Sequence, residues 1–176
     1  MAADIFYGHN IAILDSLGNE KKRYRAENVA RGIERFVEDN FRGLAETSIE
    51  LPSDAEMFIN IESLAMFFTE VLNFVMGRAL LKMRFYSERG KIIVRLFSDP
   101  PLPYTVDEAK HFIAFARDVG FDLCRIDGDA VFIIDCFERK KYTVYAPPFI
   151  DNVKIISQVF ENVFYRQNNS EKQFKM

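Results

Sequence analysis

The fold is decided by residues 61–99, which read IESLAMFFTEVLNFVMGRALLKMRFYSERGKIIVRLFSD. Apolar residues recur at helical spacing from Ile61 onward, and no glycine or proline interrupts them before Gly77, which predicts a long helix. Asn60 stands directly before this run and is a residue type that caps helices by accepting a backbone N–H bond. Because apolar side chains surround most of the helix, we expect it to be a central helix with more than one covered face.

Two runs of alternating or β-branched residues follow this helix and are joined by Arg89-Gly90, which predicts a β-hairpin. Asp99 ends the second run, where strands pass into loops and ligand contacts are common. A small polar island, Thr69, Glu70 and Asn73, interrupts the apolar helix. Polar groups on a buried helix must find hydrogen-bond partners or border a cavity. The candidate site residues are therefore Glu70, Asn73 and Asp99.

The order of these features resembles the ATP-binding domain of sensor histidine kinases and the wider GHKL ATPase superfamily. The resemblance spans residues 25–138 and is carried by TEVLNFV on the helix and FSDPP after the hairpin. It implies that Asn73 helps hold Mg²⁺ against the phosphates, that Asp99 accepts from the adenine amino group, and that Glu70 is a catalytic, water-activating or metal-associated carboxylate. It also implies an α+β fold: a two-layer α/β sandwich with a mixed, mostly antiparallel sheet covered on one face by helices.

The chain also departs from the family pattern around the nucleotide. The family has Asp-x-Gly-x-Gly where this chain has Asp99 followed by PPLP, and prolines cannot supply backbone N–H groups. The glycine-rich segment over the triphosphate and the lid before it are missing, so no phosphate cradle is evident. In branches with a catalytic Glu, that residue lies four positions before the Asn; this chain has Thr69 there, and Glu70 is one residue out of register. These departures predict a degenerate member with weak or lost binding of ATP and Mg²⁺.

The rest of the chain predicts supporting elements. The periodicity and turn signals predict a helix over 25–44, short strands within 47–51 and 56–61, a helix over 105–119, a second hairpin over 121–137, a strand within 142–148 and a helix over 150–166. The division that follows is a lead-in segment 1–24, a histidine-kinase-like domain 25–147, an extra C-terminal helix 148–166 and a polar, frayed tail 167–176.

The helix after the prolines has the clearest start signal. Thr105 and Glu108 stand three residues apart and predict a capping box. The buried stripe predicted for this helix is Val106, Ala109, Phe112, Ile113, Ala116 and Val119. His111 lies off that stripe, and no carboxylate nearby in the sequence is spaced to meet it, so it is expected to face solvent.

Composition sets the broad class. The 176 residues fit one domain, and the 18 phenylalanines predict an aromatic-rich core. The net charge of −3 argues against nucleic acid as a partner, and no segment resembles a membrane span or a signal peptide, so a cytoplasmic protein is expected. Strand alternation puts Cys124 and Cys136 on opposite faces of the second hairpin, which predicts neither a disulfide nor a metal site.

Three functions stay open. The first is a degenerate histidine-kinase-like module in bacterial signalling that acts through contacts with a signalling protein and is not an enzyme. The second is a divergent ATP- and Mg²⁺-binding ATPase or an anti-sigma-type protein kinase. The third is an unrelated α+β structural or small-ligand domain. The apolar stripe of the C-terminal helix makes a homodimer through that helix plausible, whereas a phosphoacceptor role for His9 would need far more chain than the lead-in segment supplies.

Overall fold

The computed structural model describes five stretches of the chain, 22–118, 125–127, 130–135, 144–145 and 152–174. The predictions for His9, Cys124 and Cys136 lie outside these described residues. The elements, in chain order, are β1 (Lys22–Arg25), α2 (Ala26–Asn40), β2 (Ala45–Glu50), β3 (Glu56–Ile59), α3 (Ile61–Val75), β4 (Leu80–Glu88), β5 (Lys91–Asp99), α4 (Val106–Asp118), β6 (Arg125–Asp127), β7 (Ala130–Asp135), β8 (Val144–Tyr145) and α5 (Val153–Phe174).

The strands form two sheets. The larger has the order β2-β4-β5-β7-β6, with β2 parallel to β4 and all other neighbours antiparallel. The smaller has the order β3-β1-β8, in which β1 is antiparallel to β3 and parallel to β8. The predicted α+β class is therefore confirmed, and the larger sheet is mixed and mostly antiparallel. The prediction of a single sheet is wrong, because β1, β3 and β8 come together from distant parts of the chain and form a second one.

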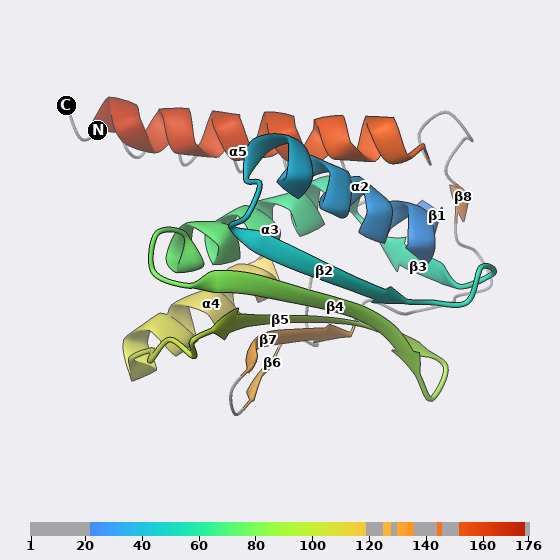
Figure 1. Cartoon of the computed structure of the whole chain (residues 1–176), viewed down its shortest axis with the longest axis horizontal. Helices are drawn as coiled ribbons and strands as arrows, with labels where there is room; N and C mark the ends of the chain where they lie inside the picture. The colour runs from blue at the N-terminus through green and yellow to red at the C-terminus, as the bar shows by residue number, and fades with distance from the viewer. Residues whose placement is uncertain (1–21, 119–124, 128–129, 136–143, 146–151, 175–176) are drawn as a thin grey trace.

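Helices α2, α3 and α5 lie on one side of the larger sheet (Figure 1), and α4 packs against α3. Helices α2 and α3 lie between that sheet and α5, which forms a third layer on the side away from the sheet. The strands turn alternate residues toward α2 and α3, so Leu81, Met83 and Phe85 of β4 are buried there. The core thus lies between the larger sheet and helices α2 and α3, and it continues between these two helices and α5.

Local signals explain the central helix and the hairpin. The Asn60 side-chain oxygen accepts the backbone N–H groups of Glu62 and Ser63, as the sequence predicts for an N-cap. Arg89 and Gly90 have φ values of 52° and 76°, so the two-residue turn has the left-handed conformation that matches the twist of paired strands. These two elements therefore form where the sequence places them.

Three predicted boundaries are wrong. Helix α2 ends at Asn40 rather than residue 44, before Gly43 with its φ of 81°. The lead-in segment contributes strand β1, which pairs with the distant β3 and so has no local signal. The C-terminal helix continues to Phe174, well beyond the predicted end at residue 166. The predicted frayed tail is helical as far as Phe174, because no glycine or proline stops the helix there and because Asn73 of α3 bonds Asn168 within it.

Helix α4 begins as predicted, but its buried stripe is partly wrong. The Thr105 hydroxyl accepts the Glu108 N–H at 3.0 Å, and the Glu108 carboxylate accepts the Thr105 N–H at 3.1 Å, which confirms the capping box. Phe112 and Ala116 are buried, whereas Val106 is 70% exposed. Val106 occupies the first turn, where helical spacing alone cannot reveal whether a neighbouring element covers the side chain.

Candidate functional site

Asn73 of α3 is held by the C-terminal helix. Its side-chain Nδ2 donates to the side-chain oxygen of Asn168 of α5 at 2.8 Å. A neutral hydrogen bond of this kind is worth about 1 kcal/mol, and more is lost when one partner is left unsatisfied. The amide that the resemblance assigns to Mg²⁺ is therefore turned toward α5 and bonded to it.

Glu70 of α3 faces a different helix. Its carboxylate lies 3.6 Å from His111 Nε2 of α4, and its side chain is 20% exposed against 59% for His111. His111 thus faces solvent as predicted, but the expectation that it meets no carboxylate is wrong. Tertiary folding supplies one from a helix 41 positions earlier in the chain. The neighbouring α3–α4 contact is aromatic, with Phe74 and Phe112 edge to face at 5.3 Å.

Asp99 lies on the opposite face of the sheet from α3. Ser98, the preceding residue, is buried toward the helices, so strand alternation turns Asp99 to the other face. The Asp99 carboxylate lies 3.1 Å from Lys82 Nζ of β4, and its side chain is 57% exposed. An exposed pair of this kind contributes about 0–1 kcal/mol.

The three candidate residues therefore do not converge. Asn73 is bonded to α5, Glu70 is beside α4, and Asp99 is paired with β4 on the far face of the sheet. A nucleotide site needs the adenine, metal and phosphate contacts arranged around one cavity. The described contacts instead pair each of these side chains with another part of the same chain.

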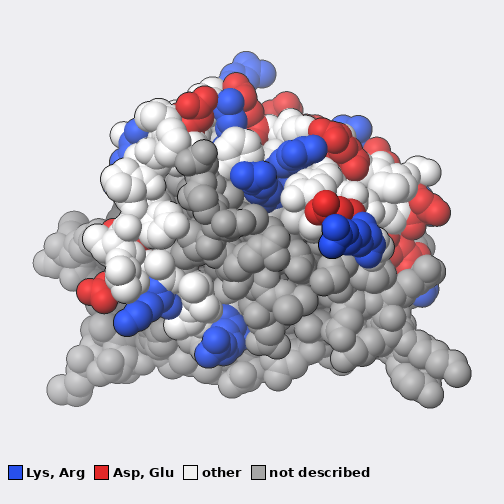
Figure 2. All heavy atoms as spheres, turned by 90° about the horizontal axis from the view of Figure 1, so that it is seen from below, with Lys and Arg blue, Asp and Glu red and all other residues white. Residues whose placement is uncertain are grey.

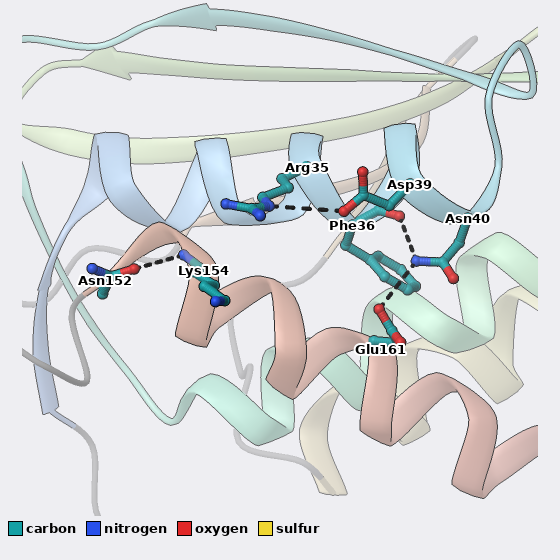
Figure 3. A network of polar contacts seen from close by, with 7 residues as sticks. All are labelled: Arg35, Phe36, Asp39, Asn40, Asn152, Lys154 and Glu161. Atoms are coloured by element: carbon teal, nitrogen blue, oxygen red, sulfur yellow. Dashed lines mark hydrogen bonds and ion pairs between the residues drawn. The ribbon is translucent and has the colours of Figure 1, made fainter.

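Hydrogen bonds of the Asn40 side chain, at the C-terminal end of α2, join this helix to α5. Figure 3 shows Asn40 turned toward α5, with Nδ2 donating to the Phe36 carbonyl at 2.9 Å and to the Glu161 carboxylate at 3.4 Å. The Asn40 side-chain oxygen accepts from the Tyr165 hydroxyl at 3.0 Å. The Asn152 side chain accepts the Lys154 N–H at 2.8 Å and so caps the start of α5.

Aromatic packing fills the space between α2, α3 and α5. Phe36, Phe68 and Phe160, one from each helix, are all nearly inaccessible to solvent. The ring centroid distances are 6.3 Å for Phe36–Phe68, 6.1 Å for Phe36–Phe160, 5.7 Å for Phe68–Phe160, 5.9 Å for Phe36–Phe164 and 4.8 Å for Phe41–Phe164. Offset and edge-to-face pairs of this kind add about 0.5–1.5 kcal/mol each beyond the apolar area that they bury. The apolar stripe of α5 is therefore covered within the chain.

Gly32 allows α2 and α5 to approach closely. A Cβ atom at this position would lie 2.4 Å from Ile156 Cγ2 and 2.7 Å from Ile156 Cβ. Such distances are far below ordinary carbon contacts of about 3.5–4.0 Å. A glycine in mid-helix costs about 1 kcal/mol relative to alanine, and here it removes the clash with α5.

The α3–α5 contact also perturbs one carboxyl group. Burial raises the pKa of the Glu62 carboxyl, and the nearby positive charge of Arg166 opposes that rise in part. Glu62 lies in the first turn of α3, where the helix dipole also favours a negative charge.

The opposite face of the larger sheet combines arginine and aromatic side chains. Arg84 stacks over the Tyr86 ring at 4.7 Å and Arg95 over the Phe97 ring at 5.5 Å. Figure 2 views the molecule from this side, and its basic and acidic atoms are interspersed among the residues that the structure describes. Arg84 also lies 3.4 Å from Glu50. The charge on the described part of this face is therefore mixed, unlike the single-sign patch typical of nucleic-acid interfaces.

The described residues hold neither a cluster of metal ligands nor a membrane span. Within them, no cluster of three or more His, Cys, Asp and Glu side chains is arranged to hold a metal ion. None of the helices in that same part of the chain has the length and apolar content needed to cross a membrane. No family model matches the sequence, and no curated protein matches it.

The sequence alone did not predict the partners of the candidate residues. Lys82 could have been found, because the register set by the Arg89-Gly90 turn puts it diagonal to Asp99 on one face of the hairpin. Asn168 and His111 carry no such signal. Each meets α3 through helix packing between segments far apart in the sequence.

Proposed function

We propose that this chain is a regulatory protein-binding module of bacterial signalling, with a histidine-kinase-like (GHKL) fold and a nucleotide site that is no longer used. The element order supports the fold: a helix with an Asn, a hairpin ending in an Asp, a helix and a second hairpin follow one another. Two long helices lie side by side on one face of a mixed sheet, as the resemblance implies.

The loss of nucleotide binding is supported above all by the hydrogen bond from Asn73 to Asn168. An Asn that holds a metal must offer its amide oxygen to the metal, in a position set by neighbouring groups. Here helix α5 lies over the α2–α3 layer and takes up the Asn73 amide as a donor. The position of the family's glycines is occupied by prolines, which offer no N–H group to a phosphate.

A second candidate is a divergent ATP-binding domain, because the exposed Asp99 side chain could still accept a hydrogen bond from a ligand. Its side chain is 57% exposed at the end of β5, and its partner is a surface lysine. A ligand donor could replace Lys82 at small cost, since exposed ion pairs contribute about 0–1 kcal/mol. In that case the Asn73 Oδ1 would have to hold Mg²⁺ while its Nδ2 donates to Asn168 of α5.

Calorimetric titration of ATP and ADP, with and without Mg²⁺, separates the two candidates. The titrated proteins are wild type, Asp99→Asn, Asn73→Ala and Asn168→Ala, each checked for folding by far-UV circular dichroism. The proposed function predicts no binding heat up to millimolar nucleotide in any of them. Binding by wild type that loses its Mg²⁺ dependence in Asn73→Ala would overturn it.

The Asn168→Ala variant tests whether α5 merely masks a working site. If wild type is silent while this variant binds ATP with Mg²⁺, the second candidate replaces the first. Asn169→Ala is the matched control, because Asn169 is an exposed neighbour on the same helix.

A further inference from the structure

Three cationic side chains lie on the face of the larger sheet that points away from α2 and α3. Lys82 and Arg84 alternate along β4 with the residues that are buried under these helices. Arg95 of β5 is directly opposite Arg84 in the antiparallel register. Residues paired in this way share a face, with Cβ atoms about 4.5–5.5 Å apart, and like charges there destabilise a sheet. The arginine pair therefore needs negative charge nearby.

Carboxylates balance two of these three cations. Lys82 Nζ lies 3.1 Å from the Asp99 carboxylate, and Arg84 Nη2 lies 3.4 Å from that of Glu50. Among the side chains that the structure describes, no carboxylate forms an ion pair with Arg95. The positive charge of Arg95 is therefore left unbalanced within the described part of the chain.

The Arg95 guanidinium is held in place and has an unused donor. Its central carbon lies 5.5 Å from the centroid of the Phe97 ring, so the cation stacks on an aromatic face. Its Nε atom is buried and has no hydrogen-bond partner among the described residues. Buried N–H groups in proteins are nearly always paired. A buried, charged N–H without an acceptor among these residues therefore points to an acceptor that another molecule supplies.

Charge and geometry identify the kind of acceptor. A planar guanidinium presents its N–H groups in a fork that matches two oxygens of a carboxylate or of a phosphate. The unbalanced charge of Arg95 is one, which equals that of a carboxylate, whereas a phosphate monoester carries about −1.5 to −2 near neutral pH. The two ion pairs of Lys82 and Arg84 also use carboxylates. A carboxylate therefore fits this position better than a phosphate.

Arg84 can supply a second contact to the same group. Its side chain is 43% exposed and that of its partner Glu50 is 59% exposed. Exposed ion pairs of this kind contribute little to stability. The Arg84 guanidinium can therefore turn from Glu50 toward a ligand at small cost, so that one carboxylate accepts from both arginines.

We propose that Arg95 and Arg84 form a binding site for the carboxylate of a ligand on the face of the larger sheet away from α2 and α3. The site goes beyond the proposed function, because it needs neither the histidine-kinase-like ancestry nor the loss of the nucleotide site. An arginine that only made this face soluble would keep its guanidinium in water. The buried Nε and the stacked ring hold the Arg95 guanidinium in one position.

The test follows the backbone amide signals of the isotope-labelled whole chain by NMR while sodium acetate is added, with sodium chloride at equal ionic strength as the reference for screening. We expect acetate to cause saturable shifts at residues 94–96. In Arg95→Gln the affinity should fall about tenfold or more, because hydrogen bonds to a charged group are lost. In Glu50→Gln it should rise by up to about fivefold, because Arg84 is released from its ion pair.

Arg78→Gln is the matched control and should bind acetate as wild type does. Arg78 also stacks over a phenylalanine, Phe74, at 5.0 Å, but it belongs to the turn between α3 and β4. Arg95→Lys keeps the charge without the planar fork, so it should still bind more weakly than wild type. This variant decides the question if far-UV circular dichroism shows that Arg95→Gln does not fold.

Four outcomes would overturn the proposal. Acetate that shifts the amide signals no more than chloride does would show that no carboxylate binds, and equal binding by wild type and the Arg95 variants would place an acetate site elsewhere. Inorganic phosphate that binds more tightly than acetate would contradict the assigned charge of the ligand. Binding by Asp135→Asn alone would show that the chain supplies the carboxylate itself, since Asp135 is opposite Ile93 on the neighbouring strand β7.

Discussion

Two surfaces of the molecule differ in how far the rest of the chain buries them: the helix layer beside α5, and the segment that follows Asp99 at the end of β5. On one side, α5 covers the helix layer with buried phenylalanines, a glycine contact and a bonded pair of asparagines. On the other, the chain after Asp99 leaves prolines, Tyr104 and Val106 exposed. The first surface is closed by the protein itself, whereas the second is ordered but uncovered. The difference indicates that stability comes from the packing on the α5 side, whereas the exposed side chains after Asp99 contribute little to it.

Phe160→Ala would break the closed side most severely. Phe160 is 1% exposed and contacts Phe36 and Phe68, so its truncation leaves a cavity between three helices. We expect a loss of about 3–5 kcal/mol in the free energy of unfolding, measured by urea denaturation. Gln158→Ala, at an exposed position of α5, is the control and should stay close to wild type. Equal stability of the two variants would show that α5 does not stabilise the fold.

Gly32→Ala tests the close approach of α2 and α5. Alanine normally stabilises a mid-helix position relative to glycine by about 1 kcal/mol. Here the added methyl would lie 2.4 Å from Ile156 Cγ2, so we expect a net loss of about 1–3 kcal/mol from overpacking. Glu38→Ala, on the exposed face of α2, is the control in the same urea experiment. A more stable Gly32→Ala protein would contradict the packing of α5 against α2.

Asn73→Ala removes the polar link between α3 and α5. It leaves the Asn168 side chain without its donor, for an expected loss of about 1–2 kcal/mol. A double-mutant cycle with Asn168→Ala should show coupling of about 0.5 kcal/mol or more, because each change removes the same bond. Additive losses in the two single variants would mean that the two amides do not interact.

Glu62→Gln should change how stability depends on pH. Burial raises the pKa of the Glu62 carboxyl above its ordinary value of 4.5, so the folded state holds the proton more tightly than the unfolded state. The charged form therefore lowers stability as the pH rises through 4.5, and this penalty is complete above the raised pKa. We expect the variant to be more stable than wild type at neutral pH, with the difference shrinking in urea titrations at lower pH. An unchanged difference across that range would contradict the raised pKa.

Val106→Ala makes a comparable truncation in the exposed segment after Asp99 and should have the smallest effect on the free energy of unfolding. Val106 is 70% exposed, so little apolar area returns to water when it is shortened. We expect a change within about 0.5 kcal/mol, as for most surface substitutions. A loss comparable to that of Phe160→Ala, measured in the same urea series, would show that the start of α4 is part of the core.

The fold was more predictable than the candidate site. Asn60, the Arg89-Gly90 turn and the Thr105–Glu108 box are local signals, and each forms as predicted. The site residues Glu70, Asn73 and Asp99 were singled out by residue type and order, which say nothing about their partners. Those partners come from α4, α5 and β4.

The sequence by itself determined the central helix, its hairpin and the restricted backbone of residues 100–103, because capping, turn geometry and proline sterics act between near neighbours. Only the tertiary structure decided that α5 covers α2 and α3 and bonds Asn73, and that Asp99 faces away from that helix layer. These results depend on which apolar faces pack together and on which face of the sheet each strand residue occupies. Both are set by contacts between segments far apart in the chain.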